Sequence, residues 1–280
     1  MNRTAAIFTA CLLFAWLFFS TTSFAQTQKS TNTRVIANGT ILPVQLNTTL
    51  SVDKSVDGQV ISGRIAQDVQ LQNGRKLHAG TKVLGHVVRV TRGNPSQITI
   101  TFDTIQMSKE EALTVSTNLR ALASYMEILT ASTPKEGGGD GGTPENAWNT
   151  TQVGGQALYG SATLRRGEQI LGHWVPGGGA VGKVEANGPC RGEVAGSSHE
   201  QALWLFSTNA CGVYGYPGVS IEHAGRTNPV GEITLQSEKS TFKVRTGSGL
   251  LLRVDNDASD ADSSASSDAT PERAGLGGVS

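Results

Sequence analysis

Alternating apolar and polar positions predict that residues 35–125 form β-strands. In GQVISGRIAQDVQLQ, one face carries Ile61, Ile65, Val69 and Leu71, and the opposite face carries polar side chains. The same two-residue period recurs in SQITITFDTI and ALTVSTNLRAL, where β-branched residues are frequent. Only SKEEAL could form a helical turn. Short strands separated by frequent turns are typical of a barrel or sandwich, and we expect a mainly β protein built on a small β-barrel.

The alternation stops after this first segment and resumes near the C-terminus. Residues 126–149 are rich in glycine and proline, as in a linker or exposed loop. Residues 150–228 keep many glycines but add aromatic and apolar side chains, which predicts an inserted subdomain with short strands. We expect residues 229–255 to supply the closing strands of the barrel, because closure removes unpaired sheet edges. Residues 256–280 have almost no large apolar side chains, and we expect a disordered tail.

The stretch KLHAGTKVLGHVVRV contains two histidines that could suggest a site. His78 directly precedes the Ala79-Gly80-Thr81 turn, and His86 lies in a run that is apolar on both faces, as in buried strands. We therefore interpret both histidines as structural and the stretch as a bend and central strand of the barrel. Just upstream, Asn73-Gly74 predicts a hairpin, because type I′ turns need positive φ at both central positions.

The first 25 residues have the layout of a secretory signal peptide. Arg3 provides a basic start, AAIFTACLLFAWLFF is an apolar run, and Ser23 and Ala25 precede a cleavage before Gln26. An uncleaved anchor helix is the alternative, although the apolar run is short for a span of about 20 residues. We expect an exported protein of the periplasm or cell surface, with a mature chain that does not span the membrane.

Positive and negative charges balance. The chain has 23 Lys plus Arg and 23 Asp plus Glu, and removal of Arg3 with the signal peptide leaves 22 against 23. Binding of nucleic acid needs a clustered basic field, so we expect no nucleic-acid partner. The overall charge does not indicate electrostatic binding to a membrane either.

Two cysteines follow the signal peptide, and both lie in the glycine-rich insertion. In an exported chain, Cys190 and Cys211 are expected to form a disulfide. The alternative is a pair of metal ligands, but neither cysteine has another Cys or His at ligand spacing. We therefore expect no metal site at these cysteines.

Polar residues in GSSHEQALW suggest one alternative activity. Ser198, His199 and Glu200 are the residue types of a hydrolase acting on an envelope polymer, but adjacent side chains usually point apart, and a surface loop is the favoured interpretation. His173, His199 and His223 could form a zinc site, yet no pair has close ligand spacing. We expect no catalytic residue, metal or cofactor.

Four aromatic residues in the insertion are weak candidates for a binding surface. Trp174, Trp204, Tyr214 and Tyr216 could stack on sugars or peptides, as in a carbohydrate-binding module. The alternative, which we favour, is that they form a small core for a segment with few other large apolar residues.

Residues 38–107 contain a series of Gly, Pro and apolar motifs. In chain order the motif positions are Gly39-Thr40, Pro43, Leu46, Gly58-Gln59-Val60, Asp68-Val69, Leu77, Gly80-Thr81, Leu84-Gly85, Phe102-Asp103 and Ile105. Together they resemble the extracytoplasmic β-barrel domain of the TrbI family of conjugation proteins and their type IV secretion counterparts, a pattern that uncharacterised exported proteins also carry.

The resemblance implies a barrel and a role in assembly. A signal peptide stands here where that family has a membrane anchor, and the long proline-rich spacer is missing. We therefore expect an exported, non-enzymatic cell-envelope protein that acts through binding or assembly, with an envelope protein or a glycan as its partner. A resemblance in fold predicts the architecture of a protein more directly than its activity.

Overall fold

The computed structural model describes residues 36–71, 74–131, 148–160, 163–175, 179–192, 199–226 and 229–256, all within one compact unit. The expected signal peptide, residues 1–25, lies outside the described residues. So do most of the expected linker and all but the first residue of the expected tail.

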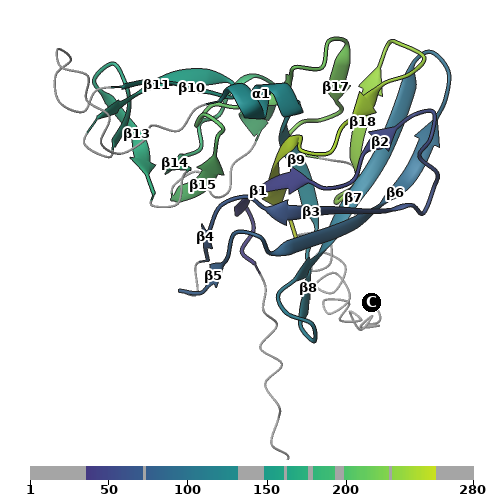
Figure 1. Cartoon of the computed structure of the whole chain (residues 1–280), viewed down its shortest axis with the longest axis horizontal. Coiled ribbons are helices and arrows are strands. Elements are labelled where there is room, and N and C mark those ends of the chain that lie inside the picture. Colours follow the sequence, from purple (N-terminus) through teal and green to yellow (C-terminus); the bar gives the residue numbers. More distant parts are fainter. Residues whose placement is uncertain are drawn as a thin grey trace, which may run out of the picture. The chain divides into compact units, whose positions relative to one another are not determined.

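The larger of two main sheets has the strand order β16-β9-β20-β1-β3-β6-β7-β18-β17, and β8 pairs with β7 at one side (Figure 1). Its strands are β1 (Ile41–Leu46), β3 (Val60–Ile65), β6 (Lys82–Thr91), β7 (Ser96–Gln106), β8 (Ala112–Thr114), β9 (Thr117–Ala123), β16 (Gly212–Tyr214), β17 (Val219–Ile221), β18 (Ile233–Ser237) and β20 (Gly249–Val254). The outermost strands, β16 and β17, are consecutive in the chain and in contact, so the sheet is a nearly closed barrel. The expected fold class, a mainly β protein built on a small barrel, is confirmed.

The strands that follow the glycine-rich segment belong to this barrel sheet. β18 pairs with β7, with Leu235 opposite Ile98. β20 lies between β1 and β9, where Leu251 is opposite both Pro43 and Ala121. The first and last parts of the barrel therefore share one hydrogen-bonded sheet.

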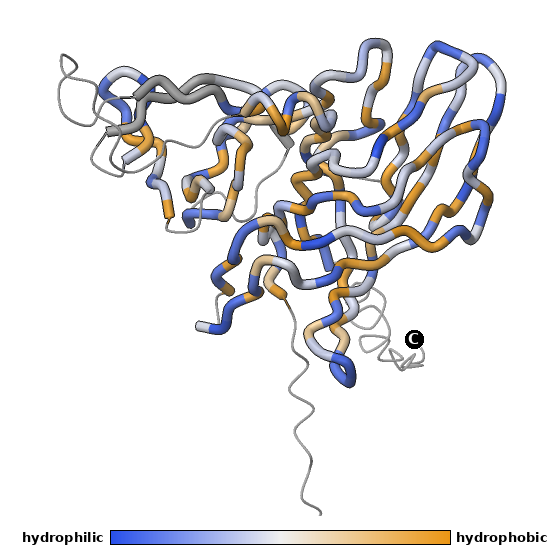
Figure 2. The backbone as a smooth tube through the Cα atoms, in the orientation of Figure 1, coloured by the Kyte–Doolittle hydropathy of each residue, from blue (hydrophilic) through white to orange (hydrophobic). Residues whose placement is uncertain are grey.

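The barrel core follows the alternation in the sequence. Ile61, Ile65, Ile98, Ile100 and Phe102 are completely buried in one cluster, and the intervening side chains are more exposed. Figure 2 shows this alternation of apolar and polar positions along the barrel strands. Because the period of two matches the pleat of a strand, the sequence predicted these inward faces correctly.

Two strands differ from the expected pattern of burial. In β6, His86 is half-exposed and its Nδ1 lies 3.3 Å from Asp103 Oδ2, so the prediction that this run is buried on both faces was wrong. In β9, by contrast, every residue is buried, including Asn118 and Arg120.

The glycine-rich segment folds into a second sheet of six consecutive antiparallel strands. They are β10 (Trp148–Gln152), β11 (Gly155–Gly160), β12 (Thr163–Arg166), β13 (Gln169–Trp174), β14 (Ala180–Lys183) and β15 (Glu200–Trp204). A bridge joins its two ends: the Val153 N–H donates to Leu205 O at 2.9 Å, and the Ser207 N–H donates to Val153 O at 3.0 Å. This second sheet therefore also has its ends connected.

The remaining elements are short. They are β2 (Leu50–Ser51), β4 (Val69–Gln70), β5 (Lys76–Leu77), β19 (Lys243–Val244), the 3-10 helix η1 (Gly188–Gly192) and α1 (Tyr125–Thr130). β4 and β5 form the hairpin that the sequence predicted, and Gly74 in its turn has a φ of 76°.

Two segments depart from the expected boundaries. α1 occupies the start of the predicted linker, and Ser124 caps it by accepting the Glu127 N–H at 3.2 Å. Six residues are too few to show a helical period. Residues 212–221, predicted within the insertion, instead provide the barrel strands β16 and β17. The parallel pairing of β16 with β9 and the contact between Tyr216 Oη and Ser248 Oγ hold this stretch against the barrel.

Candidate functional site

The second sheet contacts the barrel along β15. The Ile41 N–H donates to Gln201 Oε1 at 3.1 Å, and the Trp204 N–H donates to Gln67 Oε1 at 2.6 Å. Gln67 is almost completely buried, and its Nε2 has no hydrogen-bond partner among the described residues. A Cβ at Gly179 would lie 2.3 Å from Gln67 Oε1, and Gly179 has a φ of 129°. Glycine at this position lets the amide of Gln67 enter the second sheet.

A buried arginine also connects the barrel to the segment that contains the second sheet. From β9, Arg120 Nε donates to Ala210 O at 2.9 Å and its Nη2 donates to Glu185 O at 2.6 Å. Burial lowers the pKa of Arg120 to about 10, a shift that leaves it charged at neutral pH. Arg120 thus holds two loops of the insertion against a barrel strand, which explains why β9 is buried on both faces.

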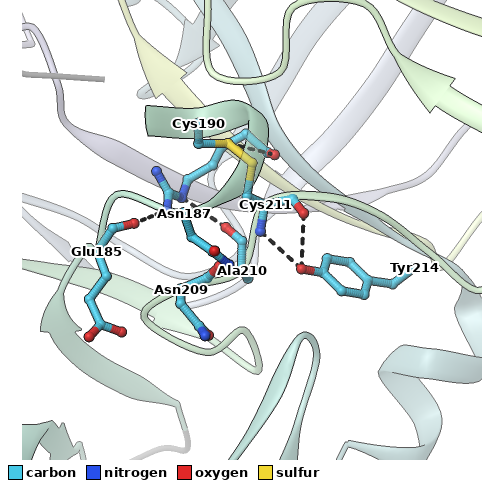
Figure 3. Close-up of a disulfide and its surroundings, with 8 residues drawn as sticks. Glu185, Asn187, Cys190, Asn209, Ala210, Cys211 and Tyr214 are labelled. Atoms are coloured by element: carbon cyan, nitrogen blue, oxygen red, sulfur yellow. Dashed lines mark hydrogen bonds between the residues drawn. A yellow bond between two sulfur atoms is a disulfide. The ribbon is translucent and has the colours of Figure 1, made fainter. Parts of the chain in front are cut away.

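The expected Cys190–Cys211 disulfide is present (Figure 3). Cys190 is completely buried, and its Sγ lies 3.7 Å from Arg120 O. Tyr214 Oη accepts the Cys211 N–H and donates to Cys211 O, both at 3.0 Å. The disulfide, the tyrosine and the arginine therefore form one rigid attachment of the insertion to the barrel.

A cleft of about 540 Å³ lies between the β4–β5 hairpin and the second sheet. Its lining consists of Asp68, Gln70, Lys76, His173, Val175, Val181, Glu200 and Ala202. Each wall carries a carboxylate beside a nitrogen-bearing side chain. On the hairpin, Lys76 Nζ lies 3.6 Å from Asp68 Oδ2; on the second sheet, His173 Nδ1 lies 3.4 Å from Glu200 Oε2. The lining also includes three apolar residues, Val175, Val181 and Ala202, so the cleft presents both polar and apolar side chains.

The geometry of the hairpin wall depends on Asp68. Its Oδ1 accepts the Ala79 N–H at 2.8 Å, and this backbone hydrogen bond lowers the pKa of the Asp68 carboxyl below its ordinary value, with Lys76 and His78 adding to the effect. The carboxylate is therefore ionised at neutral pH and fixes the turn that follows β5. His78, predicted as a corner residue, lies in this turn with its side chain largely exposed.

The structure locates Glu200 and the three histidines that the sequence suggested for catalysis or metal binding. Glu200 pairs with His173 from β13, whereas its neighbour His199 is exposed, and Ser198 lies outside the described residues. His223 lies beyond β17, where its Nε2 is 3.8 Å from Glu222 Oε1. Within the described part of the chain, no three His, Cys, Asp or Glu side chains are grouped to hold a metal ion.

The four aromatic candidates are packed against the two cores. Trp174 and Trp204 are both register partners of Ala180 and pack on the cluster that contains Leu203 and Phe206.

Both tyrosine hydroxyls have internal partners. Tyr214 bonds the disulfide loop, and Tyr216 Oη lies 2.6 Å from Ser248 Oγ. Burial raises the pKa of the Tyr216 phenol above its ordinary value. These contacts are those of packing residues.

The cleft contains three polar residues that sequence reasoning did not select as site candidates: Asp68, Gln70 and Lys76. The predicted hairpin indicated that these polar side chains share one face, but no local pattern indicated that the second sheet lies opposite them.

No described helix has the length and apolar character needed to cross a membrane. No protein-family model matches the chain, and a search of curated proteins found no significant match. The similarity to the TrbI family stays a prediction from the motifs alone.

Proposed function

We propose that this protein is an exported, non-enzymatic envelope protein that binds an extended polypeptide segment of a partner in the cleft between the hairpin and the second sheet. The observation that carries the proposal is the arrangement of polar side chains in the cleft. Asp68 and Lys76 face the cleft from one wall, and His173 and Glu200 face it from the other. A polypeptide carries charged, polar and apolar side chains along one strand, so it can engage both walls and the apolar residues of the lining.

The partial exposure of these side chains favours reversible binding of a ligand. The side chains of His173 and Glu200 are 44% and 46% exposed, so water still solvates them and each can exchange its internal partner for a ligand group at low cost. The backbones beneath them are held by sheet pairing, by Gln67 and by the Arg120 attachment. A rigid site loses less conformational entropy on binding, which favours affinity. The resemblance to barrels that take part in assembly supports the same proposal.

Site-specific photocrosslinking in intact cells tests this function. A benzophenone side chain placed at Gln70, inside the cleft, is expected to give a discrete crosslinked product with another envelope protein. The same side chain at Lys109, an exposed position in the β7–β8 turn, is the matched control and is expected to give none. The reversal Lys76→Glu should abolish the Gln70 product. Equal products from both positions, or a Gln70 product that Lys76→Glu leaves unchanged, would contradict the proposal.

One observation favours a second candidate, hydrolysis. Glu200 Oε2 lies 3.4 Å from His173 Nδ1, and a carboxylate beside this ring nitrogen can orient a histidine that acts as a general base. None of the described residues that line the cleft is a serine, threonine or cysteine. A hydrolase would therefore need a nucleophile from elsewhere, such as the Ser198 suggested by the sequence.

Ester hydrolysis by the purified protein separates the two candidates. If the protein acts by binding, His173→Ala leaves hydrolysis of p-nitrophenyl acetate at the rate of the unaltered protein. A loss of about 100-fold or more in His173→Ala, with His223→Ala unaffected as the control, would instead establish His173 as a general base.

A further inference from the structure

A second surface, remote from the cleft, surrounds the short helix α1. Tyr125, Met126 and Leu129 are 45%, 59% and 61% exposed, although each is a large apolar or aromatic side chain. The fourth apolar residue, Ile128, is buried and packs against Gly249. One turn of helix therefore presents three adjacent apolar side chains to the outside, more than a scattered surface residue would.

Cationic side chains lie directly beside this helix. Tyr125, Lys243 and Arg245, with Thr49 and Thr246, line a shallow hollow of about 580 Å³. The Tyr125 ring covers Gly247, where a Cβ would lie 2.6 Å from its Cδ2, so the aromatic side chain and the cations belong to one surface. We call this surface, made of Tyr125, Met126, Leu129, Lys243 and Arg245, the α1 patch.

Two acidic side chains near the α1 patch, those of Glu127 and Asp53, make contacts outside it. On the same helix, Glu127 extends its side chain toward Gly215, where its Cγ would lie 2.7 Å from an added Cβ. Asp53 Oδ2 accepts a hydrogen bond from Thr241 Oγ1 at 2.6 Å. The α1 patch therefore combines exposed apolar side chains with positive charge, in a protein whose total charge is balanced.

We propose that the α1 patch is a membrane-contact surface that binds reversibly to anionic lipid, with Lys243 and Arg245 at the phosphate groups and Tyr125, Met126 and Leu129 in the interfacial region. Tyrosine is favoured at the boundary between headgroups and acyl chains, and each cation near an anionic surface adds attraction. A second copy of the chain is a poorer occupant, because two such patches would bring like charges together. The apolar side chains of the helix project from a shallow surface. Such a surface can insert into the interfacial region of a bilayer, whereas a protein partner would need a surface of complementary shape.

This inference does not depend on the proposed function of the cleft. The two surfaces share no residue, so the cleft could hold a partner while α1 contacts a lipid surface. With a single turn and two cations the contact is weak, and binding should fall steeply as salt rises.

Flotation with lipid vesicles tests the proposal, using the protein from Gln26 onward so that the apolar leader is absent. This protein contains every described residue. It is expected to float with vesicles of phosphatidylcholine containing about 30% phosphatidylglycerol, and not with pure phosphatidylcholine. The double variant Leu129→Gln/Arg245→Glu should reduce the bound fraction about tenfold or more at low salt. Both side chains are exposed, so the fold is expected to persist, and circular dichroism checks this.

A matched control changes the same kinds of side chain elsewhere. Ile170 on β13 is 60% exposed, and Lys109 is exposed in the turn between β7 and β8. Figure 1 shows the strand β8 well separated from α1. The variant Ile170→Gln/Lys109→Glu should bind vesicles like the unaltered protein. Equal loss in both double variants, equal flotation with neutral vesicles, or no flotation at low salt would overturn the proposal. Inorganic phosphate is expected to compete only at concentrations where it acts as salt, and competition well below them would indicate a soluble anion as the ligand instead.

Discussion

Replacing Arg120 with methionine is expected to lower the free energy of unfolding by about 3 kcal/mol. The change removes the donors to Ala210 O and Glu185 O and leaves both carbonyls without the guanidinium that satisfies them. Methionine also relieves the cost of burying a charge, seen in the lowered pKa of Arg120, but this gain is smaller than the loss of two charge-assisted hydrogen bonds. Urea unfolding followed by circular dichroism measures the difference.

The exposed Arg64 on β3 provides the control. Its Nη2 bonds Gln45 Oε1 in an exposed position, so Arg64→Met should change stability by no more than about 0.5 kcal/mol. Because Arg120 joins the barrel to the loops of the insertion, its loss should also make the insertion more sensitive to protease than the barrel. An Arg120→Met protein with an unchanged urea midpoint would show that these hydrogen bonds do not stabilise the fold.

The second large effect is expected from Gly85→Ala in β6. A Cβ at this position would lie 1.8 Å from Thr101 O and 2.9 Å from Phe102 Cα, in the neighbouring strand β7. Both are backbone atoms of a central strand, so they cannot move aside without breaking the hydrogen bonds between β6 and β7. The register of this strand pair already shifts between Leu84 and Gly85. We expect a loss of about 3 kcal/mol or more, measured by thermal and urea unfolding.

Gly58→Ala separates this steric effect from the cost of a left-handed backbone. Gly58 has a φ of 79° and open space around its Cα, so alanine there should cost only about 1 kcal/mol. If Gly85→Ala proved as stable as Gly58→Ala, the close approach of the two strands would not be what requires glycine.

The fold class and the inward faces of the barrel followed from the sequence because they depend on local alternation. Ile61 and Ile65 were predicted to share one face and are completely buried. The same reasoning was wrong for His86, because an unbroken apolar run does not reveal whether another element covers its second face. β9 shows the reverse case: Arg120 is buried only because the insertion, encoded far along the chain, packs against it.

The candidate site was only partly accessible to sequence reasoning. His173 and Glu200 were both noticed, but as members of different groups. They lie on β13 and β15, separated by β14, so their contact depends on strand order and register. The α1 patch was missed because a balanced total charge gives no information on how charges and apolar side chains are grouped at the surface.

The sequence by itself determined the β class, the faces of most barrel strands, the hairpin and the two cysteines able to pair, because each follows from short-range periodicity, turn chemistry or composition. Tertiary structure alone decided that residues 212–221 return to the barrel, that Arg120 is buried, and that the hairpin faces the second sheet across a cleft. These features come from contacts between residues distant in the chain, and their energies depend on packing that no local pattern encodes.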